Sequence, residues 1–214
     1  MSVDRYLLDL ERFVRADWNS LVSIRDTAGP QGHCGVPTAL LGFSVLDAMA
    51  FLVVGTKLDD TLGSSLGALV TGDNKTLFPS LVRIAPFADI LIPVFRNGIS
   101  HRFYPKACGI ARGIATDPIL VENTTGSYVL NPDALVHTML EFINELRLYI
   151  ARPTSIPLEL LEARLSAMIA HDHMTFQLAK CSTRRLAAVR THGPIVTTPS
   201  GMGTTTTPPI TAGP

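Results

Sequence analysis

The sequence predicts a mainly α-helical fold, a bundle of four or more helices with a small β-hairpin insertion. Apolar residues recur at the three- to four-residue spacing of helices that bury one face, in segments near both ends of the first 150 residues. Short β-prone pieces follow Pro105 and flank a turn rich in Asn, Thr and Gly. These two patterns together define the fold class.

The composition narrows the class of function before any motif is considered. Charged residues make up 17% of the chain, against about 25% in typical soluble domains, so part of the surface is expected to face other protein. Eighteen Lys and Arg balance eighteen Asp and Glu, which excludes the strongly basic footprint of a dedicated, non-specific nucleic-acid binder. An anion-binding function therefore requires a local patch.

The N-terminal segment predicts an amphipathic helix that ends near Asp26. Its apolar positions recur close to helical spacing and are Leu7, Leu8, Phe13, Val14, Trp18, Leu21 and Val22. Charged residues interrupt the apolar run that a signal peptide would need. We expect this segment to be the first helix of the protein itself.

Residues 36–55 are nearly all apolar and long enough to span a bilayer. Asp47 near their centre would cost about 2.5 to 3.5 kcal/mol in a membrane. We therefore expect a central helix surrounded by other helices, and no membrane partner. The connection that follows is expected to hold a short helix over residues 62–70.

The third apolar stretch, residues 77–101, contains three prolines, and two of them lie where a helix is expected. Pro86 fits the first turn of a helix, whereas Pro93 lies inside the pattern and removes a backbone hydrogen bond. The helix is expected to start near Pro86 and to be irregular before Arg96.

A small hairpin is expected where residues 119–122 and 128–130 flank a turn at 123–126. The sequence Asn131-Pro132-Asp133 then signals a helix start. The apolar positions of this fourth helix recur at helical spacing and are Leu135, Met139, Phe142, Ile143, Leu146 and Ile150.

The predicted domain organisation has three parts. Residues 1–151 form the bundle, and residues 152–192 form a basic helical arm of one helix or two. Residues 193–214 are rich in Thr and Pro and carry no charge; such a composition cannot bury a core and predicts a disordered tail.

The candidate functional residues gather at the end of the third helix. Asn97 and His101 are four residues apart and share a helix face, while Arg96 lies on the adjacent ridge. The cations and aromatic rings that follow are candidates for RNA binding, because aromatic side chains stack on bases: Arg102, Phe103, Tyr104 and Lys106. Between Ile90 and Thr116 there are four basic residues, the fourth being Arg112, and no acidic one. This window predicts a local anion site.

Arg96, Asn97 and His101 also match the Arg-x4-6-His motif of the HEPN superfamily, which this chain resembles over roughly residues 4–151. HEPN domains are helical bundles that commonly dimerise; many are metal-independent endoribonucleases, and others are non-catalytic binding modules. The resemblance implies that Arg96 holds the scissile phosphate and that His101 is the general acid or base. It implies that Asn97 orients His101 or the phosphate.

Two other Arg and His pairs, Arg164 with His171 and Arg185 with His192, also fit the motif spacing. Neither has an Asn directly after the Arg or a strongly apolar helix leading into it. We treat both pairs as chance matches.

A purely structural reading of the same residues stays open. Arg96, His101 and Arg102 near a helix C-terminus are favoured by the helix dipole and can bond its last carbonyl groups. Asp47 and Asp89 lie in apolar surroundings and are structural partners in this reading, one of them pairing with a basic residue of the site.

No cofactor or metal site is expected. His171 and His173 are two residues apart and point in different directions on a helix, and no further ligand has a suitable spacing. The three cysteines lie far apart in the chain, so neither a disulfide framework nor a zinc ribbon is indicated.

The first functional hypothesis is a toxin-like, metal-independent endoribonuclease that acts through the Arg-Asn-x3-His motif. The alternative is a non-catalytic HEPN-like helical module that binds nucleotide, RNA or a protein partner. A third hypothesis is a structural protein whose tail is a tether. We expect a cytoplasmic homodimer, with RNA as a partner and a protein inhibitor or antitoxin as a second one.

Overall fold

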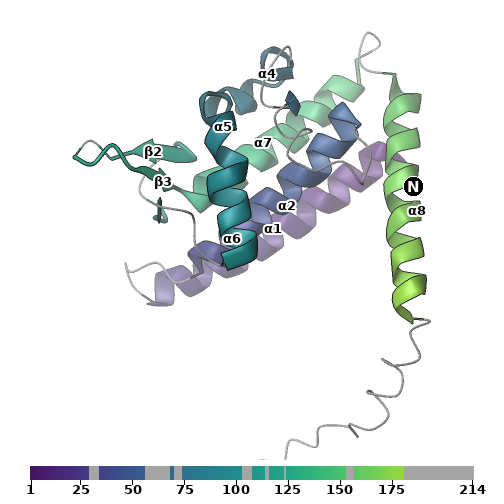
Figure 1. Ribbon diagram of the computed structural model, residues 1–214. Coiled ribbons are helices and arrows are strands. Elements are labelled where there is room, and N and C mark those ends of the chain that lie inside the picture. Colours follow the sequence, from purple (N-terminus) through teal and green to yellow (C-terminus); the bar gives the residue numbers. More distant parts are fainter. Residues whose placement is uncertain are drawn as a thin grey trace, which may run out of the picture. The chain divides into compact units, whose positions relative to one another are not determined.

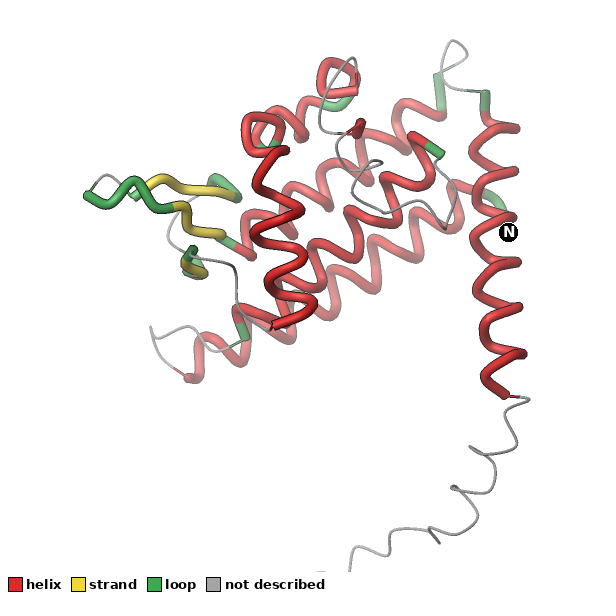
Figure 2. Tube along the Cα trace, in the orientation of Figure 1, coloured by secondary structure: helices red, strands yellow, loops and turns green. Residues whose placement is uncertain are grey.

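A computed structural model of the chain describes residues 1–28, 34–55, 68–69, 74–102, 108–113, 116–122, 124–152 and 157–180; for residues 25–28, 75, 100–102 and 172–180 it describes the backbone only. Most described residues are helical, and one small sheet has three strands (Figure 2). The predicted class, mainly α with a small β insertion, is confirmed. The expected helix at 62–70 lies almost entirely outside the described residues, as do the tail and the arm beyond residue 180.

Three long helices form the centre of the bundle: α1 (Val3–Ala28), α2 (Gly35–Val54) and α7 (Pro132–Ile150). Each packs against the other two (Figure 1). The side chains of α1 that face α2 and α7 include Leu7 and Val14, both buried. The prediction that Phe13 belongs to the buried face of α1 is wrong, because its side chain is 69% exposed.

The predicted central helix is confirmed as α2, most of whose residues are buried. Gly42 lets α2 approach α7 closely, because a Cβ atom there would lie 2.9 Å from the side chain of Leu135. By length and composition alone α2 also qualifies as a membrane span, a test that a buried core helix passes equally well.

The predicted irregular third helix is a continuous helical run from Ala85 to Arg102. It consists of η2 (Ala85–Phe87), α5 (Ala88–Ile90), the π-helical segment η3 (Leu91–Arg96) and α6 (Asn97–Arg102). Pro86 lies in its first turn, as predicted, and Pro93 lies within the π segment. The run is preceded by α4 (Asn74–Leu77) and by the 3₁₀ helix η1 (Pro79–Arg83).

The predicted hairpin is confirmed by β2 (Ile119–Val121) and β3 (Tyr128–Leu130), which pair antiparallel. A third strand, β1 (Gly109–Ile110), pairs parallel with β3, so the strand order is β1-β3-β2. The chain then enters α7, where the Asn131 side chain accepts a hydrogen bond from the Ala134 amide, as the helix start signal predicts.

The last described helix is α8 (Leu158–Lys180). The chain is organised as two units, Met1–Ala170 and His171–Pro214. Within the first unit, Leu161 and Leu165 of α8 belong to the hydrophobic core. The Arg164 side chain donates to the backbone carbonyls of Leu52 and Val53 at 2.9 and 2.6 Å, and so caps the C-terminal end of α2.

Candidate functional site

Pro93 lies in the irregular segment that leads into the predicted site. Its nitrogen carries no hydrogen, so the ordinary α-helical hydrogen bond at this position is lost. The backbone widens into the π segment η3, and the Asn97 amide donates to the Ile92 carbonyl five residues earlier. Such segments occur frequently at functional sites, and this one ends at Arg96.

The Arg96 guanidinium is held by two side chains. Its Nη2 lies 3.1 Å from Asp47 Oδ2 of α2, and its Nη1 donates to Asn97 Oδ1 at 3.2 Å. The side chains of Arg96 and Asp47 are 22% and 19% exposed. The predicted pairing of a buried aspartate with a basic residue of the site is therefore observed for Asp47, whereas Asp89 is exposed.

Asp47 is only partly compensated in its surroundings. Burial raises the pKa of its carboxyl group above the ordinary value, and the charge and hydrogen bond of Arg96 offset only part of this effect. Its second oxygen, Oδ1, is buried and has no hydrogen-bond partner among the described residues. The Asp47 carboxylate therefore depends on Arg96 for its compensation.

Arg96 retains hydrogen-bonding capacity. A guanidinium has five N–H donors, and the two contacts with Asp47 and Asn97 use two of them. Both acceptors are side-chain oxygens and not the last carbonyls of the helix, so Arg96 does not cap the helix, but its pairing with Asp47 is the contact that the structural reading predicts. Its orientation is fixed while part of its surface remains exposed.

His101 and Arg102 belong to the helical backbone of α6, and His101 follows Asn97 by one turn, about 6 Å along the axis. The side chains of both residues lie outside the described part of the chain, as do Phe103, Tyr104 and Lys106 in full. The structure therefore brings together Arg96, Asn97 and Asp47.

Arg112 does not belong to the predicted anion site. Its side chain is 1% exposed, and its Nε and Nη2 donate to the two carboxylate oxygens of Asp133 at 2.9 and 2.7 Å. The absence of acidic residues between positions 90 and 116 wrongly suggested that Arg112 is available to an anion, because folding brings Asp133 of α7 to Arg112.

A second group of polar side chains was not singled out in the sequence. It surrounds an open pocket between α1, η1, α7 and the segment before β2, and its lining residues are Trp18, Arg83, Thr116, Asp133, Ala134 and His137. Only their spatial proximity marks them, since they come from four separate segments. Among the described residues, no group of three or more His, Cys, Asp or Glu side chains has the arrangement of a metal site.

Comparison with known proteins identifies no relative: no family model, curated protein or solved structure matches this chain.

Proposed function

We propose that this protein is a metal-independent endoribonuclease in which Arg96 binds the scissile phosphate and His101 transfers protons. The observation that supports this most directly is the Arg96 guanidinium, fixed by Asp47 and Asn97 yet partly exposed. A donor group held in place before the substrate arrives needs no reorganisation during the reaction. The choice of RNA rests on the resemblance of Arg96, Asn97 and His101 to the HEPN motif.

The proposed reaction uses the ribose of the substrate as nucleophile. The 2′-hydroxyl oxygen forms a bond to phosphorus and gives its proton to a general base, while the bond to the 5′-oxygen breaks and that oxygen takes a proton. A neutral imidazole such as His101 exchanges protons near pH 7. Arg96 stabilises the negative charge on the phosphate oxygens, and Asn97 orients the guanidinium by accepting its hydrogen bond.

A second candidate is a non-catalytic module that binds RNA, nucleotide or a protein partner through the same surface. The Asp47 carboxylate favours this candidate, because an adjacent negative charge offsets part of the guanidinium's attraction for phosphate. A homodimer and a protein inhibitor or antitoxin are compatible with either candidate and remain proposals.

Substitution of the motif residues tests the catalytic proposal. His101→Ala should lower the cleavage rate of RNA by about two orders of magnitude or more, the usual effect of losing a general acid or base. Arg96→Lys should also slow cleavage, because an ammonium does not reproduce the planar grip of a guanidinium. The product should carry a 2′,3′-cyclic phosphate or its opened form, and activity should persist in chelator.

His171→Ala is the matched control, because Arg164 and His171 satisfy the same spacing without the same surroundings; it should cleave like the wild type. Wild-type cleavage by His101→Ala would refute the catalytic role. Binding of RNA without cleavage, weakened by Arg96→Lys, would establish the second candidate instead.

A further inference from the structure

A pocket of about 310 Å³ opens on the face that α1, η1 and α7 share. This volume lies at the lower end of the range for small-molecule sites, about 300 to 1,000 Å³. Trp18 and Ala134 contribute apolar surface, whereas Arg83, Thr116 and His137 contribute polar groups. An apolar pocket with a few convergent polar groups is the usual composition of a ligand site.

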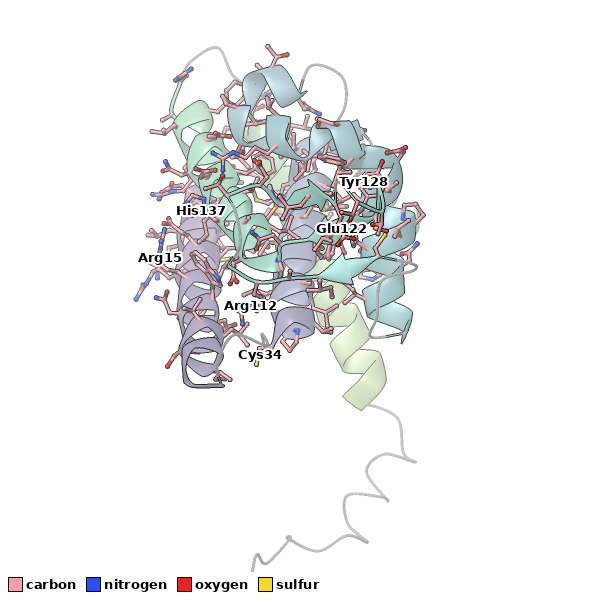
Figure 3. All side chains as sticks on the ribbon, turned by 90° about the vertical axis from the view of Figure 1, so that its left-hand side faces the viewer. Arg15, Cys34, Arg112, Glu122, Tyr128 and His137 are labelled. Carbon is pink, nitrogen blue, oxygen red and sulfur yellow. The ribbon has the colours of Figure 1, made fainter. Side chains whose placement is uncertain are left out.

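The aromatic side of the pocket is held rigidly. The Trp18 indole N–H donates to Asp133 Oδ1 at 2.9 Å, and the buried Arg112 donates two hydrogen bonds to the same carboxylate. The Trp18 and His137 rings meet edge to face, with centroids 6.3 Å apart. Figure 3 shows the labelled Arg112 and His137 close to the α1 ribbon. A ligand therefore meets an indole ring whose orientation is already fixed, which lowers the entropic cost of binding.

The hydrogen-bonding side of the pocket is formed by Arg83 and His137, both partly exposed and both adjacent to Glu141. Arg83 Nη1 lies 3.2 Å from Glu141 Oε2, and His137 Nδ1 lies 3.6 Å from Oε1. Neither contact is a hydrogen bond. The His137 Nε2 atom and the other guanidinium N–H groups have no partner among the described residues, so they are free to bind a ligand.

The two acidic side chains near the pocket differ in how fully they are compensated. Asp133 is bound by Arg112 and Trp18, whereas Glu141 lies beside Arg83 and its buried Oε2 has no hydrogen-bond partner among the described residues. The charge of Asp133 is therefore balanced, whereas Glu141 competes with an incoming anion for Arg83.

We propose that this pocket binds a small planar anion, an aromatic or heteroaromatic ring that carries a carboxylate or phosphate group. The ring packs against Trp18 and Ala134, and the anionic group accepts hydrogen bonds from Arg83 and His137. The pocket is built by α1, η1 and α7, whereas the Arg96 cluster is built by α2, η3 and α6, so this proposal is independent of the proposed function.

The chain contains one tryptophan, so its fluorescence reports on this pocket alone. The intact protein is titrated with AMP and with benzoate, which carry a phosphate and a carboxylate on an aromatic ring system. Adenosine and inorganic phosphate, the two halves of AMP, are titrated separately. Isothermal calorimetry gives a second readout. We expect a saturable change in fluorescence and heat with AMP or benzoate, and binding at least about tenfold weaker for adenosine and inorganic phosphate.

Arg83→Gln and His137→Gln should each raise the dissociation constant about tenfold, the scale of one lost hydrogen bond to a charged group. Both side chains are partly exposed, so the far-UV circular dichroism should stay unchanged. Arg5→Gln is the matched control, because Arg5 forms an exposed ion pair with Asp9 elsewhere on α1; its affinity should equal that of the wild type.

Three results would overturn the proposal. The first is no saturable response to AMP or benzoate in either fluorescence or heat. The second is equal affinity for a full ligand and one of its halves. The third is binding that survives both Arg83→Gln and His137→Gln unchanged.

Discussion

A single carboxylate, that of Asp47, determines the state of the motif arginine. The pair combines a buried acid whose second oxygen lacks a hydrogen bond among the described residues with a base that retains exposed donors. Removing one member of such a pair leaves the other uncompensated. Asp47 therefore both fixes Arg96 and moderates its charge.

The raised pKa of Asp47 predicts a pH dependence of stability. The folded protein holds the Asp47 proton more tightly than the unfolded chain, whose pKa lies near the ordinary 3.8. Its contribution to the free energy of unfolding is therefore full below that value and is lost as pH rises through the folded-state pKa. Because Asp47→Asn cannot titrate, the stability of the wild type minus that of the variant should fall across this window.

Urea unfolding of both proteins at a series of pH values from about 4 upward measures this difference. In an Arg96→Gln background the fall should extend to higher pH, because the interaction that lowers the Asp47 pKa is gone. A difference that rises with pH would mean that the ion pair outweighs burial.

The sequence predicts the interaction partners of some individual residues and not of others. A partner for Asp47 is predictable, because an acid inside an apolar helix requires compensation. The pair of Arg112 and Asp133 is not, since counting charges in a continuous window omits residues that folding brings in. Phe13 fits the apolar face of α1 by spacing, yet the described fold leaves it exposed.

Among the helices, α2 ends with a capping arrangement made by two parts of the chain. Gly55 adopts φ +73°, and its amide donates to the Phe51 carbonyl. A Cβ atom at Gly55 would overlap the Arg164 guanidinium, which lies over this end of α2 and binds two of its carbonyls. Arg164 thereby attaches α8 to the central helix within the first unit.

Arg164→Ala should lower the free energy of unfolding by about 1 to 3 kcal/mol, because two carbonyls lose a charged donor. Chemical denaturation measures the change. Glu162→Ala, an exposed substitution on the same helix, serves as control and should stay within about 0.5 kcal/mol of the wild type. Equal effects of the two substitutions would contradict the capping role.

The long helices with regular apolar spacing can be predicted from the sequence, whereas the short or irregular elements cannot. The spacing of apolar residues predicts α1, α2 and α7, and turn residues predict the pairing of β2 with β3. The parallel pairing of β1 with β3 joins segments that no local pattern relates. Pro93 predicts an irregularity, but whether the backbone kinks or widens depends on packing around it.

For the molecule as a whole, the low charge content is the basis of the proposed homodimer, and several large apolar side chains are exposed. The most exposed of these on α1, η1 and α7 are Phe13, Val82 and Leu148. Such residues occur singly on the surfaces of many proteins.

We expect a homodimer with the Arg96 region near the interface. Light scattering at micromolar concentration should give about twice the chain mass of 23.1 kDa. A monomeric mass for the wild type would contradict the dimer.

The π segment Leu91–Arg96 also bears on how the chain can change in length during evolution. A π turn holds one residue more than an α turn, so the helix accommodates an inserted residue there. Losing one residue from η3 restores ordinary α geometry, whereas losing one from α2 or α7 rotates every following side chain by about 100° and turns core residues outward. Homologues that differ by a single-residue gap are therefore expected to carry it within residues 91–96, and not within residues 35–54 or 132–150.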